Sequence, residues 1–206
     1  MGITTPYFRI CRPFISGSYI ESTNNSYICD TRYANNSVDL IRGYHQLEKE
    51  LLRICDFIEP ADANINCYSY QLYALLLRAS TEFEANAKAI LIANGYKNSR
   101  NLNIKDYHKL NAATRLAEYT VTFPIWDGIH RKIQPFSEWV SGESLTWYQG
   151  YNTVKHNRAS KFSLASLGNV FKAVAAVYAI VFAQFQILTF NPHHIVEVSA
   201  VFILIK

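Results

Sequence analysis

The sequence lacks the short motifs that usually identify a nucleotide, nucleophile or metal site. It has no glycine-rich phosphate loop, no G-x-S-x-G nucleophile elbow and no H-E-x-x-H motif. Its four cysteines show no paired short spacing, and no histidine lies at ligand spacing beside them. The cysteines are Cys11, Cys29, Cys55 and Cys67. We therefore predict neither a metal site nor a cofactor.

A secretory signal is also missing, because no basic region followed by an apolar run opens the sequence. Four ordinary thiols suit a reducing compartment, so a cytoplasmic protein is expected. The segment from Ala173 to Phe190 is about as long as the shortest membrane-spanning helices, although Gln184 and Gln186 interrupt it. A helix buried in a bundle explains the same apolar surface. We predict a core helix and no membrane contact, and keep a membrane-anchored protein as an alternative.

The composition suits one domain with a large core. Half of the 206 residues are apolar and 14% are aromatic, which indicates an interior built largely on rings. The net charge of +4 permits RNA binding without requiring it. Rings in such a chain belong to the core more often than to a base-stacking surface.

Apolar residues recur every three or four positions in several parts of the chain, a spacing that predicts helices. The predicted helices run from about Val38 to Glu59, Tyr68 to Asn94, Leu145 to Arg158 and Leu164 to Leu188, with shorter ones around Tyr107 to Leu116 and within Trp126 to Lys132. Ser37 is of the type that caps a helix start, and Gly95 stands where a helix commonly ends in the left-handed conformation.

Short strands are expected only near the two ends of the chain. The segments are Tyr7 to Cys11, Ser26 to Tyr33 and the tail from Ile195 to Ile205, which is rich in Val, Ile and Phe. The predicted fold class is mainly α, with small β additions at both termini. Residues 1–36 would form an N-terminal segment, 37–190 a helical bundle and 191–206 a strand-like tail of one domain.

The predicted helix before the last long one carries most of the reactive side chains. Asn152 and His156 are four residues apart, so they share a face of a helix, and Tyr148 lies on the same side. Lys155 and Arg158 add positive charge, which favours a neutral imidazole that accepts a proton and also attracts phosphate. The alternative is a solvated helix end without a ligand.

Tyr151-Asn152-x-x-x-His156 resembles the Arg-Asn-x-x-x-His signature of HEPN domains, the higher-eukaryote and prokaryote nucleotide-binding family. HEPN domains are helical bundles in which the motif leads into a late helix. An earlier helix of the family bears a polar or acidic residue near the motif, a place that Glu82 or Glu84 would fill. The similarity covers about 38–188, and its specific part is the spacing of Asn152 and His156.

The resemblance implies a function in RNA chemistry. Many HEPN proteins are metal-independent endoribonucleases of bacterial toxin–antitoxin or phage-defence systems, and two protomers usually bring their motifs together. By this resemblance, His156 would be the base that activates the ribose 2′-hydroxyl, Asn152 would orient it and Tyr151 would position the phosphate group. Lys155, Arg158 and Tyr148 would contact RNA or its phosphates. A homodimer is therefore expected, with RNA and a cognate protein as candidate partners.

One position departs from the family signature. Tyr151 stands where the signature has Arg, and a phenol brings neither charge nor a bidentate fork to a phosphate. In a continuous helix Arg158 lies about 160° around the axis from His156, so it helps only if the helix ends near Asn157 or if it reaches across a dimer. Two hypotheses follow: an RNA-binding or RNA-cleaving HEPN-like protein, and a catalytically inactive HEPN-like module that dimerises or binds a protein.

Overall fold

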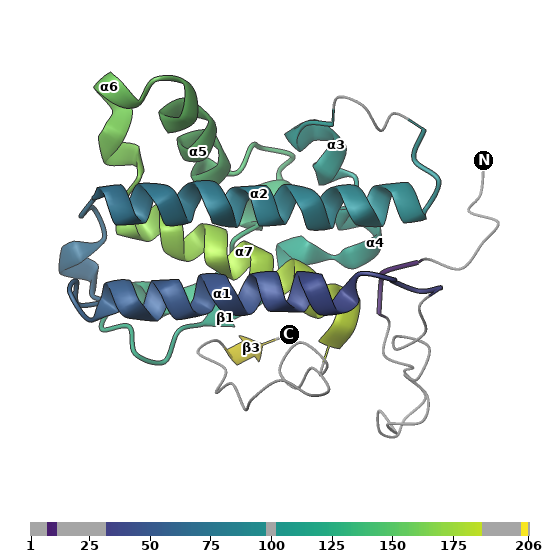
Figure 1. The fold of residues 1–206 in the computed structure, drawn as a ribbon, viewed down its shortest axis with the longest axis horizontal. Coiled ribbons are helices and arrows are strands. Elements are labelled where there is room, and N and C mark those ends of the chain that lie inside the picture. Colours follow the sequence, from purple (N-terminus) through teal and green to yellow (C-terminus); the bar gives the residue numbers. More distant parts are fainter. Residues whose placement is uncertain (1–7, 12–31, 98–101, 187–202, 206) are drawn as a thin grey trace.

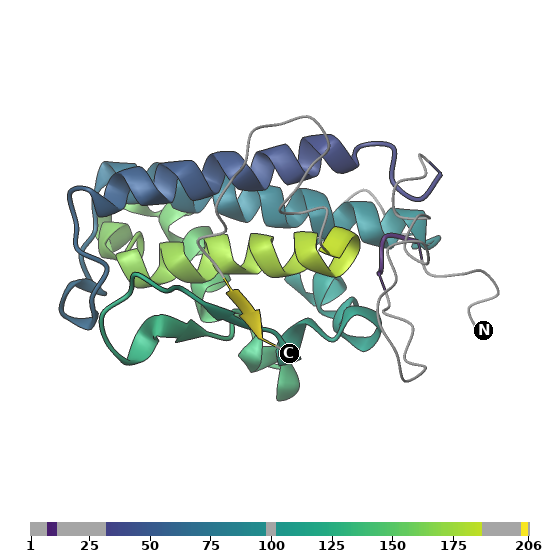
Figure 2. The same cartoon turned by 90° about the horizontal axis from the view of Figure 1, so that it is seen from below.

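The computed structural model describes residues 8–11, 32–97, 102–186 and 203–205. Four helices form its body: α1 (Ser37–Cys55), α2 (Tyr70–Ala93), α5 (Thr146–His156) and α7 (Leu167–Phe185). Helices α2 and α7 pack along each other, α1 packs against both, and α5 covers them from another side (Figure 1, Figure 2). The prediction of a mainly helical protein is confirmed.

Helix α7 lies at the centre of the core. No residue from Ala173 to Val181 is more than 1% exposed. The helix is long and apolar enough to cross a membrane, but 78% of its most apolar window is buried inside the protein. A helix enclosed by other helices needs an apolar surface all round. The apolar composition of α7 therefore agrees with its place in the core.

The ends of the long helices differ in detail from the predictions. Helix α1 begins at Ser37 itself, its N-cap is Asn36, and it ends at Cys55, earlier than the predicted Glu59. The left-handed end of α2 is confirmed, because Gly95 has a φ of 77°. Its amide and that of the next residue bond back to the last turn of α2, which satisfies the helix's free carbonyl groups.

The middle of the chain is more broken than predicted. The helix expected around 107–116 is split into α3 (Ile104–His108) and α4 (Asn111–Thr114), and Arg115 ends the second with a φ of 56°. The short helix expected within 126–132 is reduced to one turn of 3-10 helix, Ile129–Arg131. Asp62 binds the amides of Ile129 and His130, which fixes this loop in another path.

Short helical pieces complete the described chain. They are α6 (Arg158–Lys161) and the 3-10 helices Asp62–Asn64, Leu116–Glu118, Ser137–Val140 and Phe162–Leu164. Helix α6 and the turn after it carry the chain from the end of α5 to the start of α7, alongside the first turn of α2 (Figure 1).

A small antiparallel sheet has the strand order β2-β1-β3, with β1 at Thr120–Thr122, β2 at Lys132–Ile133 and β3 at Ile203–Ile205. Val121 is paired with Ile133 on one side and with Leu204 on the other. Strand β3 confirms a strand in the predicted tail; 187–202 lie outside the described residues. Strand β1 was not predicted, because three residues are too few to show a period of two.

The described part of the N-terminal segment packs against the ends of α2 and α7. Residues 8–11 form a turn and an extended piece, so the strand predicted there is wrong over these residues. The amide and carbonyl of Phe8 both bond to the Asn94 side chain, at 2.9 and 2.8 Å, and the amide of Cys11 bonds to the carbonyl of Ala183. These backbone groups thereby bind the bundle in place of a neighbouring strand. Of the second predicted strand, 26–31 lie outside the described chain, and its last two residues, Arg32 and Tyr33, form a turn instead of a strand.

Candidate functional site

Helix α5 is anchored to the bundle by its inner face. The side chains of Trp147 and Val154 are fully buried, and Trp147 Nε1 donates to the carbonyl oxygen of Pro135 at 2.9 Å. Gly150 allows a close approach to α7, because a Cβ there would lie 2.9 Å from Nδ2 of Asn169. The helix is thus fixed in rotation, which decides which of its side chains face solvent.

His156 and Asn152 lie on the outer part of α5. His156 is the last residue of the helix and is exposed, and Asn152 is half-buried one turn earlier. The helix is continuous between them, so they share a face as predicted. Neither side chain forms a hydrogen bond or an ion pair with any residue in the described ranges, so the direct bond between amide and imidazole is not made. Both remain available to a ligand.

Tyr151 points inward, away from the position that a phosphate ligand would need. Its side chain is 2% exposed and its ring lies 5.4 Å from the ring of Tyr148. The hydroxyl oxygen accepts a hydrogen bond from Lys155 Nζ at 3.1 Å. This bond raises the pKa of the Lys155 ammonium group. Tyr151 therefore holds Lys155 on α5 rather than presenting its own hydroxyl to solvent.

Of the two candidate acids, Glu84 lies beside α5 and Glu82 does not. The hydroxyl of Tyr148 donates to Glu84 Oε1 at 2.7 Å, and burial together with this carboxylate raises the pKa of Tyr148 strongly. Glu84 is half-buried, and its contact with Tyr148 places it beside α5. Glu82 faces α1, where a Cβ on Gly43 would meet its Oε2 at 2.9 Å, and burial raises its pKa.

Helix α5 ends near Asn157, which is the condition under which Arg158 was expected to assist His156. Asn157, with φ −138° and ψ 54°, breaks the helix, and Arg158 begins α6. The guanidinium carbon of Arg158 lies 5.7 Å from the ring centroids of both Tyr70 and Tyr73, in the first turns of α2. Such a distance is typical of a cation–π contact. Arg158 is thus held against α2 at the side of α5.

The tyrosines under Arg158 belong to a larger group of rings that the sequence did not predict. The ring of Phe162 lies 5.5 Å from Tyr68, 4.8 Å from Tyr70 and 6.0 Å from Tyr73. Tyr68 and Tyr70 are 53% and 66% exposed. We call Tyr68, Tyr70, Tyr73, Phe162 and Arg158 the aromatic corner. Its members come from two distant segments, so only the folded chain brings them together.

The segment that supplies Arg158 to the aromatic corner is rich in cations. Lys155, Arg158 and Lys161 are all exposed within one short stretch. The sequence has no Asp or Glu between Glu143 and Glu197, and none from residue 63 to residue 81. No acidic side chain from either contributing segment therefore neutralises the corner. An anionic ligand with flat, apolar groups fits this combination of rings and cations.

A polar cluster that the sequence did not predict surrounds Asp62. Its carboxylate accepts bonds from Trp126 Nε1 at 2.8 Å and from the amides of Ile129 and His130, and its Oδ1 lies 2.7 Å from His130 Nδ1. The bond from Trp126 is the main cause of a strongly lowered pKa of Asp62. The adjacent backbones are also paired, between Asp62 and Asp127. This cluster ties the α1–α2 connection to the loop around Gly128.

The three tryptophans are core residues, as expected for rings in a chain this rich in them. Trp126, Trp139 and Trp147 are all buried. Within the described ranges no group of three His, Cys, Asp or Glu side chains is placed to hold a metal ion. Cys55 and Cys67 are free thiols.

No protein-family model, curated protein or solved structure matches this chain. The HEPN-like character stays a prediction that rests on Asn152, His156 and the helical bundle around them.

Proposed function

We propose that the protein binds single-stranded RNA at the aromatic corner and along the cationic end of α5. The observation that carries the proposal is the placement of Arg158 over Tyr70 and Tyr73, with Tyr70 still 66% exposed. Exposed aromatic rings beside basic side chains are the usual surface for unpaired bases and their phosphates. The HEPN-like motif, which lies on α5, supports RNA as the ligand.

Each part of the corner has a distinct task in this proposal. The exposed rings of Tyr68 and Tyr70 stack on bases, which a single strand can turn outward and a duplex cannot. Arg158 and Lys161 contact phosphates, and the guanidinium group offers two parallel donors to a phosphate. Lys155, which donates to the buried hydroxyl of Tyr151, adds a further exposed cation on α5. The proposed strand thus passes from the start of α2 towards His156.

A second candidate function is metal-independent cleavage of the bound RNA. It is favoured by the exposed imidazole of His156, which no described side chain engages, at the end of the helix that carries Lys155. In this proposal His156 takes the proton of a ribose 2′-hydroxyl, whose oxygen bonds to the adjacent phosphorus, while Asn152 orients the same nucleotide. The bond from phosphorus to the 5′-oxygen of the next nucleotide breaks, this oxygen takes a proton from water, and a 2′,3′-cyclic phosphate remains. Tyr151 is buried, so Arg158 or Lys161 must supply the charge beside the phosphate. The homodimer and the defence or toxin–antitoxin setting remain parts of this HEPN-like proposal, and so does a cognate protein partner.

Binding and cleavage are separated by one set of incubations. A labelled single-stranded RNA of about 12 nucleotides, within the site sizes of known single-strand binders, is mixed with the protein in EDTA. Fluorescence anisotropy reports binding and a denaturing gel reports whether the RNA stays intact. We expect binding that Tyr70→Ala weakens. Cleavage that His156→Ala abolishes would add the enzymatic function. Absence of binding for RNAs of several sequences would overturn the proposal.

A further inference from the structure

Helix α1 carries a row of four polar side chains, three of them basic, on the face that points away from the core. Arg42, Gln46, Lys49 and Arg53 are exposed and follow one another at steps of four, three and four residues. Residues so spaced lie on one side of a helix, and the step from Lys49 to Arg53 is about 6 Å along the axis. Phe57, 85% exposed, follows at the end of the row. The row ends beside the α1–α2 connection.

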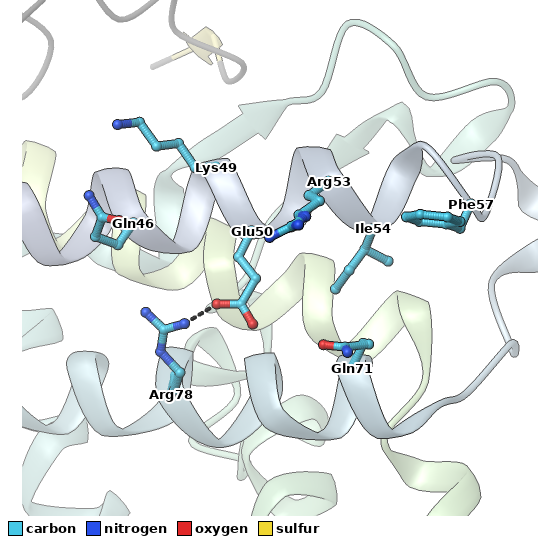
Figure 3. Close-up of a pocket in the computed structure, with 8 residues that line it drawn as sticks. All are labelled: Gln46, Lys49, Glu50, Arg53, Ile54, Phe57, Gln71 and Arg78. Atoms are coloured by element: carbon cyan, nitrogen blue, oxygen red, sulfur yellow. Dashed lines mark hydrogen bonds and ion pairs between the residues drawn. The ribbon is translucent and has the colours of Figure 1, made fainter.

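A groove with a volume of ≈ 560 Å³ separates this row from α2 (Figure 3). Its lining comes from both helices: Gln46, Lys49, Glu50, Arg53, Ile54 and Phe57 of α1 and its exit, and Gln71 and Arg78 of α2. Glu50 and Arg78 form an ion pair that joins the two helices across the groove. Three cationic side chains and a single carboxylate line the groove, so it carries a positive charge.

The groove continues the aromatic corner. Gln71, at the Phe57 end of the groove, directly follows Tyr70, whose ring belongs to the corner. Both residues are exposed on the first turn of α2. In Figure 1 the start of α2 lies between α6 on one side and α1 on the other. The ring of Tyr70 therefore belongs to the residue that directly precedes a lining residue of the groove.

We propose that the α1–α2 groove is a second binding segment for the same RNA strand. This inference rests on the proposed function. It extends the path of the bound strand beyond the aromatic corner, on the side away from His156. The strand stacks at Tyr68 and Tyr70, passes Gln71 and places its phosphates along Lys49 and Arg53. Phe57 offers a further ring for stacking, and the amides of Gln46 and Gln71 offer hydrogen bonds to base edges. The positive charge of the groove favours an anionic occupant, and its continuity with the exposed rings of the corner favours RNA over an acidic protein segment.

The test compares two lengths of single-stranded RNA and two charge-reversed proteins. An oligonucleotide of about 4 nucleotides fills the corner alone, and one of about 16 nucleotides also reaches the groove, both within the range of single-strand site sizes. The groove variant is Lys49→Glu with Arg53→Glu. The control is Lys105→Glu with Lys132→Glu, which changes the net charge equally on α3 and β2, away from the groove. A neutral variant, Lys49→Gln with Arg53→Gln, replaces the groove variant if charge reversal prevents folding.

We expect the groove variant to bind the long RNA at least tenfold more weakly than the control variant does. The two variants should bind the short RNA with the same affinity. If the wild type binds both RNAs and the groove variant matches the control for both, the groove inference is overturned and the corner stands. If the wild type binds neither RNA, the proposed function fails as well. A poly-glutamate peptide that binds the wild type as tightly as the long RNA, and not the groove variant, would show that the groove holds an acidic protein segment instead.

Discussion

The guanidinium carbon of Arg158 lies 5.7 Å from the centroid of the Tyr70 ring, and the same distance separates it from Tyr73. This relationship connects the segment after the HEPN-like motif to the first turn of α2. It also holds a cation beside an exposed ring, in a part of the sequence without acidic residues. The proposed RNA site depends on that juxtaposition more than on any single residue of the motif.

The salt dependence of RNA binding should distinguish the contribution of the Arg158 cation from that of the Tyr70 ring. Each phosphate contact made by a cation adds about 0.7 to the slope of log affinity against log salt for a single strand. We expect Arg158→Gln to reduce this slope by about that amount. Tyr70→Ala should leave the slope unchanged and weaken binding by about 1–3 kcal/mol, the range for a stacked base.

The control for the salt series is Arg115→Gln. Arg115 is an exposed arginine that pairs with Glu118, and it lies outside the aromatic corner. Its replacement should change neither the slope nor the affinity at moderate salt. An equal loss of slope in Arg115→Gln and Arg158→Gln would mean that net charge alone, and no defined corner, attracts the RNA.

Tyr151→Phe should alter stability and leave RNA binding unchanged. The hydroxyl of Tyr151 accepts a bond from Lys155 inside the protein, and such a bond contributes about 1 kcal/mol. We expect chemical denaturation to show a loss of that size, with the same RNA affinity as the wild type. A loss of RNA binding of about tenfold or more, without loss of stability, would show that Tyr151 contacts the ligand as the family motif implied.

Replacing Asp62 with Asn should lower the free energy of unfolding at neutral pH. The same replacement should have a smaller effect in acid. The pKa of Asp62 is lowered in the folded state, mainly by the bond from Trp126, so the ionised carboxylate stabilises the fold. That contribution is complete above the ordinary Asp pKa of 3.8 and disappears as pH falls below it towards the lowered value. The difference in unfolding free energy between wild type and variant should therefore narrow below about pH 4.

The matched control for Asp62 is Asp127→Asn. Asp127 lies in the same pair of loops, but its side chain is exposed and forms no hydrogen bond with the described residues. We expect little change in stability at any pH. A difference between wild type and Asp62→Asn that stays constant from pH 7 to pH 3 would contradict the account of the carboxylate given above.

Glu50→Gln should strengthen the binding of a long RNA. Glu50 is the carboxylate among the residues that line the α1–α2 groove, and it pairs with Arg78. Its neutralisation raises the local charge by one and releases Arg78 for a phosphate. Glu118→Gln releases Arg115 in the same way at another place on the surface, so it should leave binding unchanged. A weaker or unchanged affinity of Glu50→Gln for the long RNA would argue against RNA in the groove.

The helical body of the fold was predictable from local patterns. Spacing of apolar residues located α2 and α5 within a few residues, and Gly95 marked the end of α2 because its left-handed φ closes the helix. The strand β1 and the loop around Asp62 were not predictable in this way. Both depend on partners far away in the sequence, Ile203–Ile205 for the strand and Trp126 for the carboxylate.

The candidate site was predictable only in part. Residue spacing pointed to α5, and His156 and Lys155 do lie exposed at its end. It could not tell that Tyr151 and Tyr148 face inward, because the rotation of α5 is set by Trp147 and by the close approach at Gly150. The aromatic corner was missed for a similar reason. No spacing within either segment reveals that Phe162 meets the first turns of α2.

Photo-crosslinking tests the central claim most directly. A single-stranded RNA that contains 4-thiouridine is bound to the protein, irradiated and digested, and the crosslinked peptides are identified by mass spectrometry. The account predicts adducts on the segment that contains Tyr68 and Tyr70, together with loss of those adducts when Arg158 is replaced by Glu. Crosslinks confined to other segments, with none at Tyr68 or Tyr70, would contradict it.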